Sequence, residues 1–115
     1  MMKFHYEQHG NIDLVALSGQ LVMANASEIR EALKPIIEAG QGKLILNLAD
    51  VNFMDSSGLS VLISALKAIR EKQGEVVLTQ ITGSVQALIE LTQLHQVFKL
   101  FADDPAALAY FQNLP

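Results

Sequence analysis

Two spacings of hydrophobic residues follow one another along the chain, and they predict alternating strands and helices. Strands are expected where apolar residues alternate or run together between turn signals, and helices where they recur every three or four residues. Gly10-Asn11 is a turn signal that predicts a hairpin between the first two strands. The pattern predicts strands at 3–9, 12–18, 43–48, 75–80 and 97–101. It predicts helices at about 26–39, from after Asp55 to near Gly74, from Gly83-Ser84 onward and from Asp104 onward.

The predicted order, ββαβαβαβα, is typical of an α/β fold. Strands that alternate with helices after an initial hairpin imply a mixed, mostly parallel sheet with right-handed connections. The near-continuous apolar strand at 43–48 suggests burial on both faces, as in a sheet that is covered by helices. The chain has 115 residues, the size of one ordinary domain, so we expect a single domain over 1–115.

Three local signals predict how the first and last helices begin and continue. Asn25 is the expected N-cap of the first helix, because Glu28 lies three residues later as in a capping box. Pro35 lies inside this helix and should kink it, since proline removes one helical hydrogen bond. Asp104 is the expected cap of the last helix, with Pro105 at the favoured first position.

Composition and charge exclude several classes of function. The net charge of −4 argues against nucleic-acid binding, which normally needs a basic face. The absence of cysteine excludes disulfides, thiol catalysis and cysteine-ligated zinc, and fits a reducing cytoplasm. No apolar run approaches the ~20 residues of a membrane helix, and the start lacks the apolar stretch of a secretory signal. We therefore expect a cytoplasmic protein without direct membrane insertion.

A short polar junction, Asp55-Ser56-Ser57-Gly58, separates the strongly apolar strand at 43–48 from the second helix. Its ordinary interpretation is a helix start, with Asp55 as N-cap and two serines in the first turn. Its functional interpretation is that one serine accepts a phosphate, which a helix N-terminus tolerates.

The helical wheel of the second helix predicts an accessible side that begins at this junction. Residues on a helix are rotated by about 100°, so Leu59, Leu62, Ile63, Leu66 and Ile69 form the expected core face. The wheel does not decide between the two serines, although it places Ser57 further outward than Ser56. The opposite side carries small side chains that would allow another protein to approach closely: Ser57, Ser60, Val61, Ser64 and Ala68.

Enzymatic and metal sites find little support in the sequence. A serine nucleophile would need a histidine beside it, yet His5, His9 and His95 lie on other elements and no G-x-S-x-G motif is present. His5 and His9 have the spacing of two zinc ligands only on a helix, whereas on a strand they lie about 13 Å apart. Neither G-x-x-x-x-G-K-[ST] nor G-x-G-x-x-G occurs. We expect no enzyme activity, no metal and no cofactor.

The segment from Asn47 to Leu59, NLADVNFMDSSGL, closely resembles the signature of STAS-domain proteins, specifically the bacterial anti-sigma factor antagonists. The turn Gly19-Gln20-Leu21 also looks like the turn after the family's second strand. The resemblance implies a STAS-type fold and a phosphorylation-controlled protein-binding switch. In this family the serine directly after the aspartate, here Ser56, is phosphorylated by a partner kinase, often the anti-sigma factor itself.

The resemblance also implies the partners of this switch. The unphosphorylated form would bind an anti-sigma factor with serine kinase activity, and the phosphorylated form would release it. A PP2C-type phosphatase would reset the switch. Independently of the resemblance, we expect the chain itself to be a monomer or weak dimer. Many family members carry acidic residues around the turn where this chain has Gln20 and Val22.

Site roles follow from combining the motif with the wheel. Asp55 would cap the helix and shape the phosphorylation site, Ser57 would support the junction, and Gly58 would permit close approach. The predicted partner surface comprises Met23, Asn25, Ser60, Val61 and Ser64. The alternative is a STAS interaction module without phosphorylation, such as a small subunit of a lipid-transport ABC complex or a stressosome-type scaffold. An assay for phosphotransfer distinguishes the two.

Overall fold

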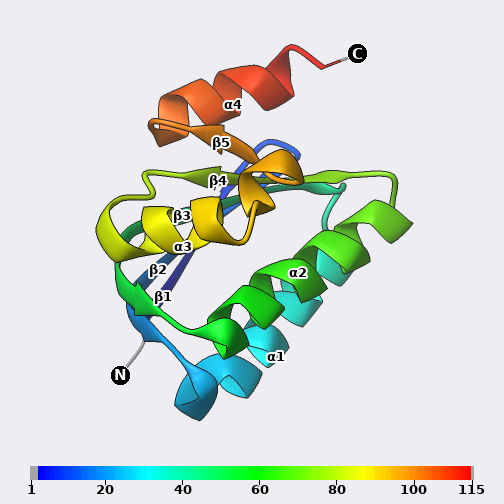
Figure 1. Cartoon of the computed structure of the whole chain (residues 1–115). Helices are drawn as coiled ribbons and strands as arrows, with labels where there is room; N and C mark the ends of the chain where they lie inside the picture. The colour runs from blue at the N-terminus through cyan, green and yellow to red at the C-terminus, as the bar shows by residue number, and fades with distance from the viewer. Residues whose placement is uncertain (1–2, 115) are drawn as a thin grey trace.

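A five-stranded sheet separates three helices on one face from a single helix on the other in the computed structural model, which describes residues 3–114 (Figure 1). The order of elements confirms ββαβαβαβα, with one additional short 3-10 helix, η1. The elements are β1 (Lys3–His9), β2 (Ile12–Leu21), α1 (Met23–Ala39), β3 (Lys43–Met54), α2 (Ser56–Glu71), β4 (Glu75–Thr79), α3 (Gly83–Leu91), η1 (Leu94–Gln96), β5 (Lys99–Phe101) and α4 (Asp104–Gln112).

The strands lie in the order β1-β2-β3-β4-β5. β1 and β2 form the predicted antiparallel hairpin, with Tyr6 opposite Val15, and every other neighbouring pair is parallel. The sheet is therefore mixed and mostly parallel, as the sequence predicts. The carboxyl ends of β2 and β3 lie together, with Leu21 opposite Met54, and this edge carries the polar junction.

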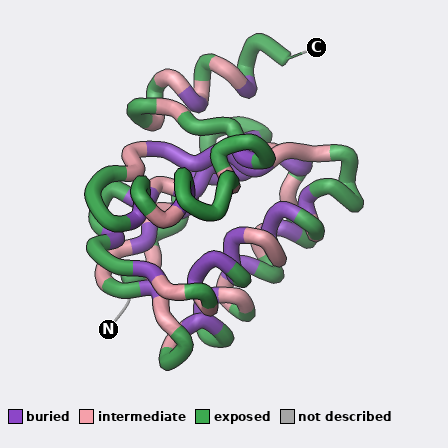
Figure 2. The backbone as a smooth tube through the Cα atoms, in the orientation of Figure 1, coloured by how far each residue is buried: buried purple, intermediate pink, exposed green. Residues whose placement is uncertain are grey.

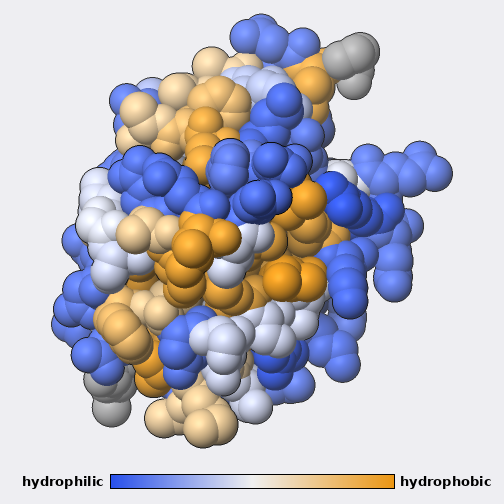
Figure 3. All heavy atoms as spheres, viewed as in Figure 1, coloured by the Kyte–Doolittle hydropathy of each residue, from blue (hydrophilic) through white to orange (hydrophobic). Residues whose placement is uncertain are grey.

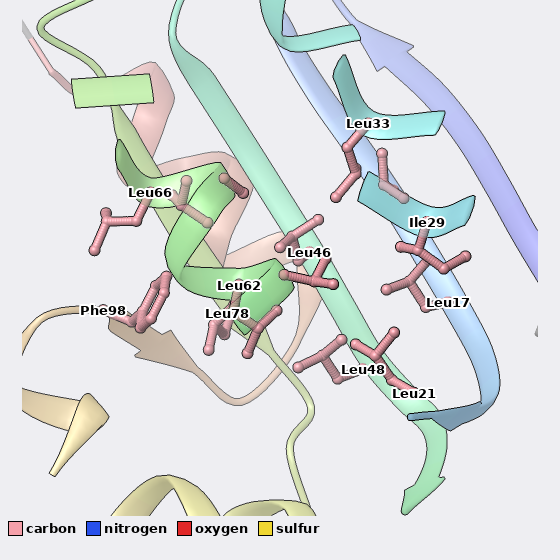
Figure 4. Close-up of a cluster of buried hydrophobic side chains, with 14 of the residues drawn as sticks. Leu17, Leu21, Ile29, Leu33, Leu46, Leu48, Leu62, Leu66, Leu78 and Phe98 are labelled. Atoms are coloured by element: carbon pink, nitrogen blue, oxygen red, sulfur yellow. The ribbon is translucent and has the colours of Figure 1, made fainter. Parts of the chain in front are cut away.

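β3 is buried on both faces, as its apolar run predicts. Leu44, Leu46 and Leu48 point into the larger core beneath α1, α2 and α3, whereas Ile45 points into a smaller core beneath α4. Figure 4 shows Leu46 and Leu48 beside Leu62 of α2, and Figure 2 shows that burial is concentrated on the sheet and the inner sides of the helices. In Figure 3 hydrophobic residues also reach the surface across the middle of the face that carries α1, α2 and α3.

The starts of two helices differ from the sequence-based prediction. α1 begins at Met23 rather than Ala26, so Asn25 is its third residue and not its N-cap, and the helix continues through Pro35 to Ala39. The cap of α4 is Asp103, whose carboxylate accepts the N–H of Ala106 at 2.9 Å. Asp104 instead accepts hydrogen bonds from Asn47 of β3 (2.8 Å) and Thr79 of β4 (2.7 Å). The predicted caps, Asn25 and Asp104, were wrong because the side chains of both residues form other hydrogen bonds. Asn25 bonds with the backbone of Gln20 and Val22, and Asp104 with the two strands.

Tyr110 fastens α4 to the sheet through a phenol that donates a hydrogen bond to the carboxylate of Glu75. Its ring also lies against Phe101, with the ring centroids 5.3 Å apart. The hydrogen bond to Glu75, together with burial and the negative charge of Glu75, raises the pKa of Tyr110 to about 12. The phenol therefore stays protonated, and able to donate, at a pH where an ordinary tyrosine has lost its proton.

The free energy of unfolding should therefore fall at high pH. The pKa of Tyr110 is higher in the folded protein than the ordinary 10.0. The stabilisation by the hydrogen bond from Tyr110 to Glu75 is therefore complete below pH 10 and is lost as the pH rises through about 12. Urea unfolding at a series of alkaline pH values measures the loss, and Tyr110→Phe is the control that should show a smaller dependence on pH. An equal dependence in both proteins would contradict this role of Tyr110.

Candidate functional site

Asp55 joins β3 to α2 and has the extended backbone of an N-cap, with φ −109° and ψ −169°. Its Oδ1 accepts the N–H groups of Ser57 at 2.8 Å and Gly58 at 3.1 Å. Two of the N–H groups that a helix leaves without an internal partner are thereby satisfied. The predicted capping role of Asp55 is confirmed.

The second oxygen of the same carboxylate binds a different helix. Asp55 Oδ2 accepts the backbone N–H of Met23, the first residue of α1, at 3.2 Å. The first turns of α1 and α2 consequently lie side by side at the lower end of the molecule in Figure 1. The Met23 side chain is 77% exposed there, so the predicted partner residue Met23 does lie beside the junction.

Gly58 is buried where α2 crosses the end of β2. A Cβ at this position would lie 2.5 Å from the carbonyl oxygen of Leu21 and would also collide with Met54. Gly58 therefore permits a close approach, as predicted, but the group that approaches is the chain's own backbone. The backbone N–H of Asp55 donates to the same Leu21 carbonyl at 3.3 Å, which draws β2, β3 and α2 together under the serines.

The two junction serines differ in exposure. Ser56 is the first residue of α2 and is exposed, whereas Ser57 is half-buried. Among the hydrogen bonds of residues 3–114, none involves the Ser56 hydroxyl. The structure thus presents Ser56 more openly than Ser57, although the helical wheel places Ser57 further outward.

The predicted partner residues on α2 differ in exposure. Ser60 is exposed and Ser64 is half-buried, but Val61 is 1% exposed and therefore cannot contact a partner. Val61 is buried because α1 packs along this side of α2, where Val61 joins Leu33 of α1 in the larger core. α2 has two buried sides, one against the sheet and one against α1, while the wheel assumed one.

Asn25 holds the backbone beside the junction and offers little to a partner. Its Oδ1 accepts the N–H of Val22 at 2.9 Å, and its Nδ2 donates to the carbonyl of Gln20 at 2.7 Å. Both polar atoms of this half-buried side chain are therefore engaged within the chain. Asn25 fixes the connection between β2 and α1, and with it the position of Met23.

Phe53 is a surface residue near the junction that the sequence-based argument missed. It lies at the carboxyl end of β3, opposite Gln20 of β2, and is 47% exposed. Strand alternation could have revealed it, because Met54 is buried and its neighbour must point to the other face. Aromatic residues are enriched at protein interfaces, so Phe53 extends the candidate surface across the end of the sheet.

The three histidines lie on other elements: His5 and His9 on β1 and His95 in η1. In the part of the chain that the structure describes, none of them hydrogen-bonds to Ser56 or Ser57, and His5 lies 3.9 Å from Glu7. Residues 3–114 hold no group of three or more acidic or histidine side chains placed for a metal ion. Nor does any helix within those residues combine the length and apolar character needed to cross a bilayer.

Comparison with known proteins agrees with this architecture. The family model of the STAS domain matches residues 3–107. The anti-sigma F factor antagonist of Paenibacillus polymyxa is 28% identical over 108 residues, which cover 93% of this chain and 92% of that protein. The crystal structure of an anti-sigma factor antagonist from Mycobacterium paratuberculosis has a TM-score of 0.90 at 22% identity and covers 98% of this chain and 96% of its own.

A further solved structure of the same fold is that of the Bacillus cell fate determinant SpoIIAA in its phosphorylated form. It has a TM-score of 0.75 at 19% identity and covers 95% of this chain and 99% of its own. The fold, the match of the family model over nearly the whole chain and the relative of nearly equal length agree with one another. The chain belongs to the STAS domain family and is related to its anti-sigma factor antagonists.

Proposed function

We propose that this protein is an anti-sigma factor antagonist whose binding is switched by phosphorylation of Ser56. The unphosphorylated chain binds an anti-sigma factor with serine kinase activity in the cytoplasm, and the phosphorylated chain releases it. The observation that carries the proposal is the open hydroxyl of Ser56 at the start of α2, beside the exposed side chain of Met23. The relationship to the anti-sigma F factor antagonist of Paenibacillus polymyxa supports a partner of the anti-sigma factor class.

Phosphoryl transfer from ATP to Ser56 requires only the serine hydroxyl from this chain. The Ser56 Oγ attacks the γ-phosphorus of ATP held by the kinase, the O–P bond forms, and the bond to the β-phosphate breaks to release ADP. The hydroxyl proton passes to a base of the kinase. The chain is thus a substrate and not an enzyme, and a PP2C-type phosphatase would hydrolyse the phosphoserine.

The charge of the phosphate accounts for release. A phosphoserine carries about −1.5 to −2 charges, and the positive end of the α2 dipole favours an anion at Ser56. The fold should therefore accept the phosphate. Asp55 already occupies the N–H groups of Ser57 and Gly58, so the phosphate is not neutralised within the chain and its charge faces the partner. Burial of an unpaired dianion in a contact is strongly unfavourable.

Intact-mass analysis with site mapping, on protein purified from its own cells, tests the modification. We expect one phosphate that is present in wild type and in Ser57→Ala and absent in Ser56→Ala. If the phosphate is lost only in Ser57→Ala, the acceptor is Ser57 rather than Ser56, and the proposed switch remains. Absence of phosphate in every growth condition, and after incubation with candidate kinases and ATP, would refute it in favour of an unphosphorylated STAS module such as a transport subunit.

A further inference from the structure

Asp13 is a carboxylate that β2 carries into the protein at the end of the molecule opposite the junction. It is 5% exposed, and Thr79 is the other buried polar side chain among residues 3–114. Its Oδ1 accepts the phenol of Tyr6 at 2.6 Å. Tyr6 and Asp13 belong to the β1–β2 hairpin, and their side chains meet on the sheet face that α1 covers.

This carboxylate has no cationic partner in the described part of the chain. The one contact within 4.0 Å between a basic and an acidic side chain among residues 3–114 is that of His5 with Glu7. Lys72 reaches the same end of α1, but its ammonium donates to the carbonyls of Glu38 and Gly40 at 2.6 and 2.7 Å. Buried charges in proteins are ordinarily paired, so the isolation of Asp13 requires an explanation.

A surface cavity of about 280 Å³ opens onto the Asp13 carboxylate. Among the described residues that line it, Asp13 carries the one charged side chain. The wall from β1 consists of the half-exposed ring of Tyr6 and of Gln8, and the wall from α1 is apolar. Its lining is Tyr6, Gln8, Asp13, Pro35, Ile36, Ala39 and Gly40.

Gly40 leaves room for the second oxygen of Asp13. A Cβ at position 40 would collide with Asp13 Oδ2, whereas the backbone there has φ −80° and ψ 177°, which any residue adopts. The glycine is therefore required by the carboxylate and not by the turn. The negative end of the α1 dipole lies at the same place, so helix and carboxylate both favour a positive ligand.

We propose that this cavity binds an organic cation, an ammonium or guanidinium group carried on a short apolar stem. Asp13 Oδ2 would pair with the cation, the Tyr6 ring would lie beside it, and Pro35, Ile36 and Ala39 would contact the stem. A metal ion fits poorly, because calcium or magnesium requires several oxygen ligands and this wall is apolar. The cation could belong to a free amine or to a lysine or arginine side chain of a partner protein.

The site is independent of the proposed switch. Met23 and Ala39 are the two ends of α1, and at 1.5 Å per residue its 17 residues span about 25 Å. Ligands at the cavity and at Ser56 therefore touch opposite ends of the helix. Failure of either proposal would leave the other standing.

Amide NMR titration at low ionic strength tests the proposal with n-butylamine and agmatine as probes. We expect saturable shifts confined to Tyr6, Ala39, Gly40 and their neighbours, with Kd on the order of millimolar for so small a ligand. Butanol and butyrate, of similar size, should bind at least about 10-fold more weakly, because neither carries the positive charge that forms an ion pair with a carboxylate. Equal binding of butanol, or no saturable shift with either amine, would overturn the proposal.

Two variants separate the charge from the fold. Asp13→Asn retains an acceptor for the Tyr6 phenol, so the rest of the spectrum should be preserved while amine binding weakens at least about 10-fold. If Asp13→Asn fails to fold, Tyr6→Phe serves as the second variant: it retains the ring but removes the phenol that shares the Asp13 carboxylate, so it should bind amines more tightly than wild type, and weaker binding would contradict pairing with Asp13. Undiminished binding in a folded Asp13→Asn would refute the assignment.

Capped Gly-Lys-Gly and Gly-Arg-Gly peptides distinguish the two sources of the cation. Binding of a peptide as tight as that of the free amine would identify a partner side chain. Binding of the free amines alone would identify a small-molecule ligand, because the cavity would then exclude a peptide backbone. Either result supports a cation site.

Discussion

Replacement of Gly58 by alanine is expected to lower the free energy of unfolding by about 2 kcal/mol, the net of an overpacking cost and a smaller gain in helix propensity. Overpacking of a filled core ordinarily costs about 1–3 kcal/mol, and this site lies at the upper end because one of the two colliding groups is the backbone carbonyl of Leu21. That carbonyl also accepts the N–H of Asp55, so it cannot move without loosening the cap of α2. The gain of about 1 kcal/mol in helix propensity from glycine to alanine offsets only part of the cost.

Urea unfolding followed by circular dichroism measures this loss, with Ser60→Ala as the matched control. Both changes place an alanine near the start of α2, but Ser60 is exposed and its replacement should leave stability within about 0.5 kcal/mol. Gly58→Ala should also broaden the amide signals of Met23 and Ser56, since Asp55 connects both helix starts. A Gly58→Ala protein as stable as wild type would show that α2 does not press on the end of β2.

The elements of the fold could be predicted because each is specified by a local pattern. The apolar run of β3 and the turn at Gly10-Asn11 need no distant partner to be recognised, and both predictions are confirmed. The helix caps could not all be predicted, because a polar side chain near a helix start can either cap the helix or form a hydrogen bond with a residue distant in the sequence. Asp103 and Asp104 are equally suitable from the sequence alone, and Asp103 caps α4 since Asn47 and Thr79 engage Asp104.

The start of α1 depends on a contact that lies 32 residues away in the chain. The Met23 N–H finds its acceptor in Asp55, so the helix begins three residues before Ala26 and Asn25 becomes free to hold Gln20 and Val22. The burial of Val61 has the same kind of cause, because it depends on where α1 packs. Sequence patterns located the junction and the cap at Asp55, but the surface around it is set by the packing of two helices.

Ser56→Asp is expected to weaken binding of the proposed partner, an anti-sigma factor with serine kinase activity, by about 100-fold. A carboxylate at Ser56 would place an unpaired negative charge within the partner contact that we propose around Met23 and Ser60. Two factors of ten correspond to about 2.8 kcal/mol of binding free energy at 1.4 kcal/mol for each. Isothermal titration calorimetry gives both Kd values, and protein phosphorylated by that kinase should bind at least as weakly as the variant.

Gln41→Glu is the control for charge alone, since it adds the same negative charge on an exposed loop at the other end of α1. It should bind the partner as wild type does. Ser56→Asp should also be as stable as wild type, because an acidic residue in the first turn of a helix is favoured by the dipole. Weak binding by a stable Ser56→Asp protein would then arise at the contact itself. Binding as tight as wild type would mean that the partner does not cover Ser56, and phosphorylation there could not release it by charge.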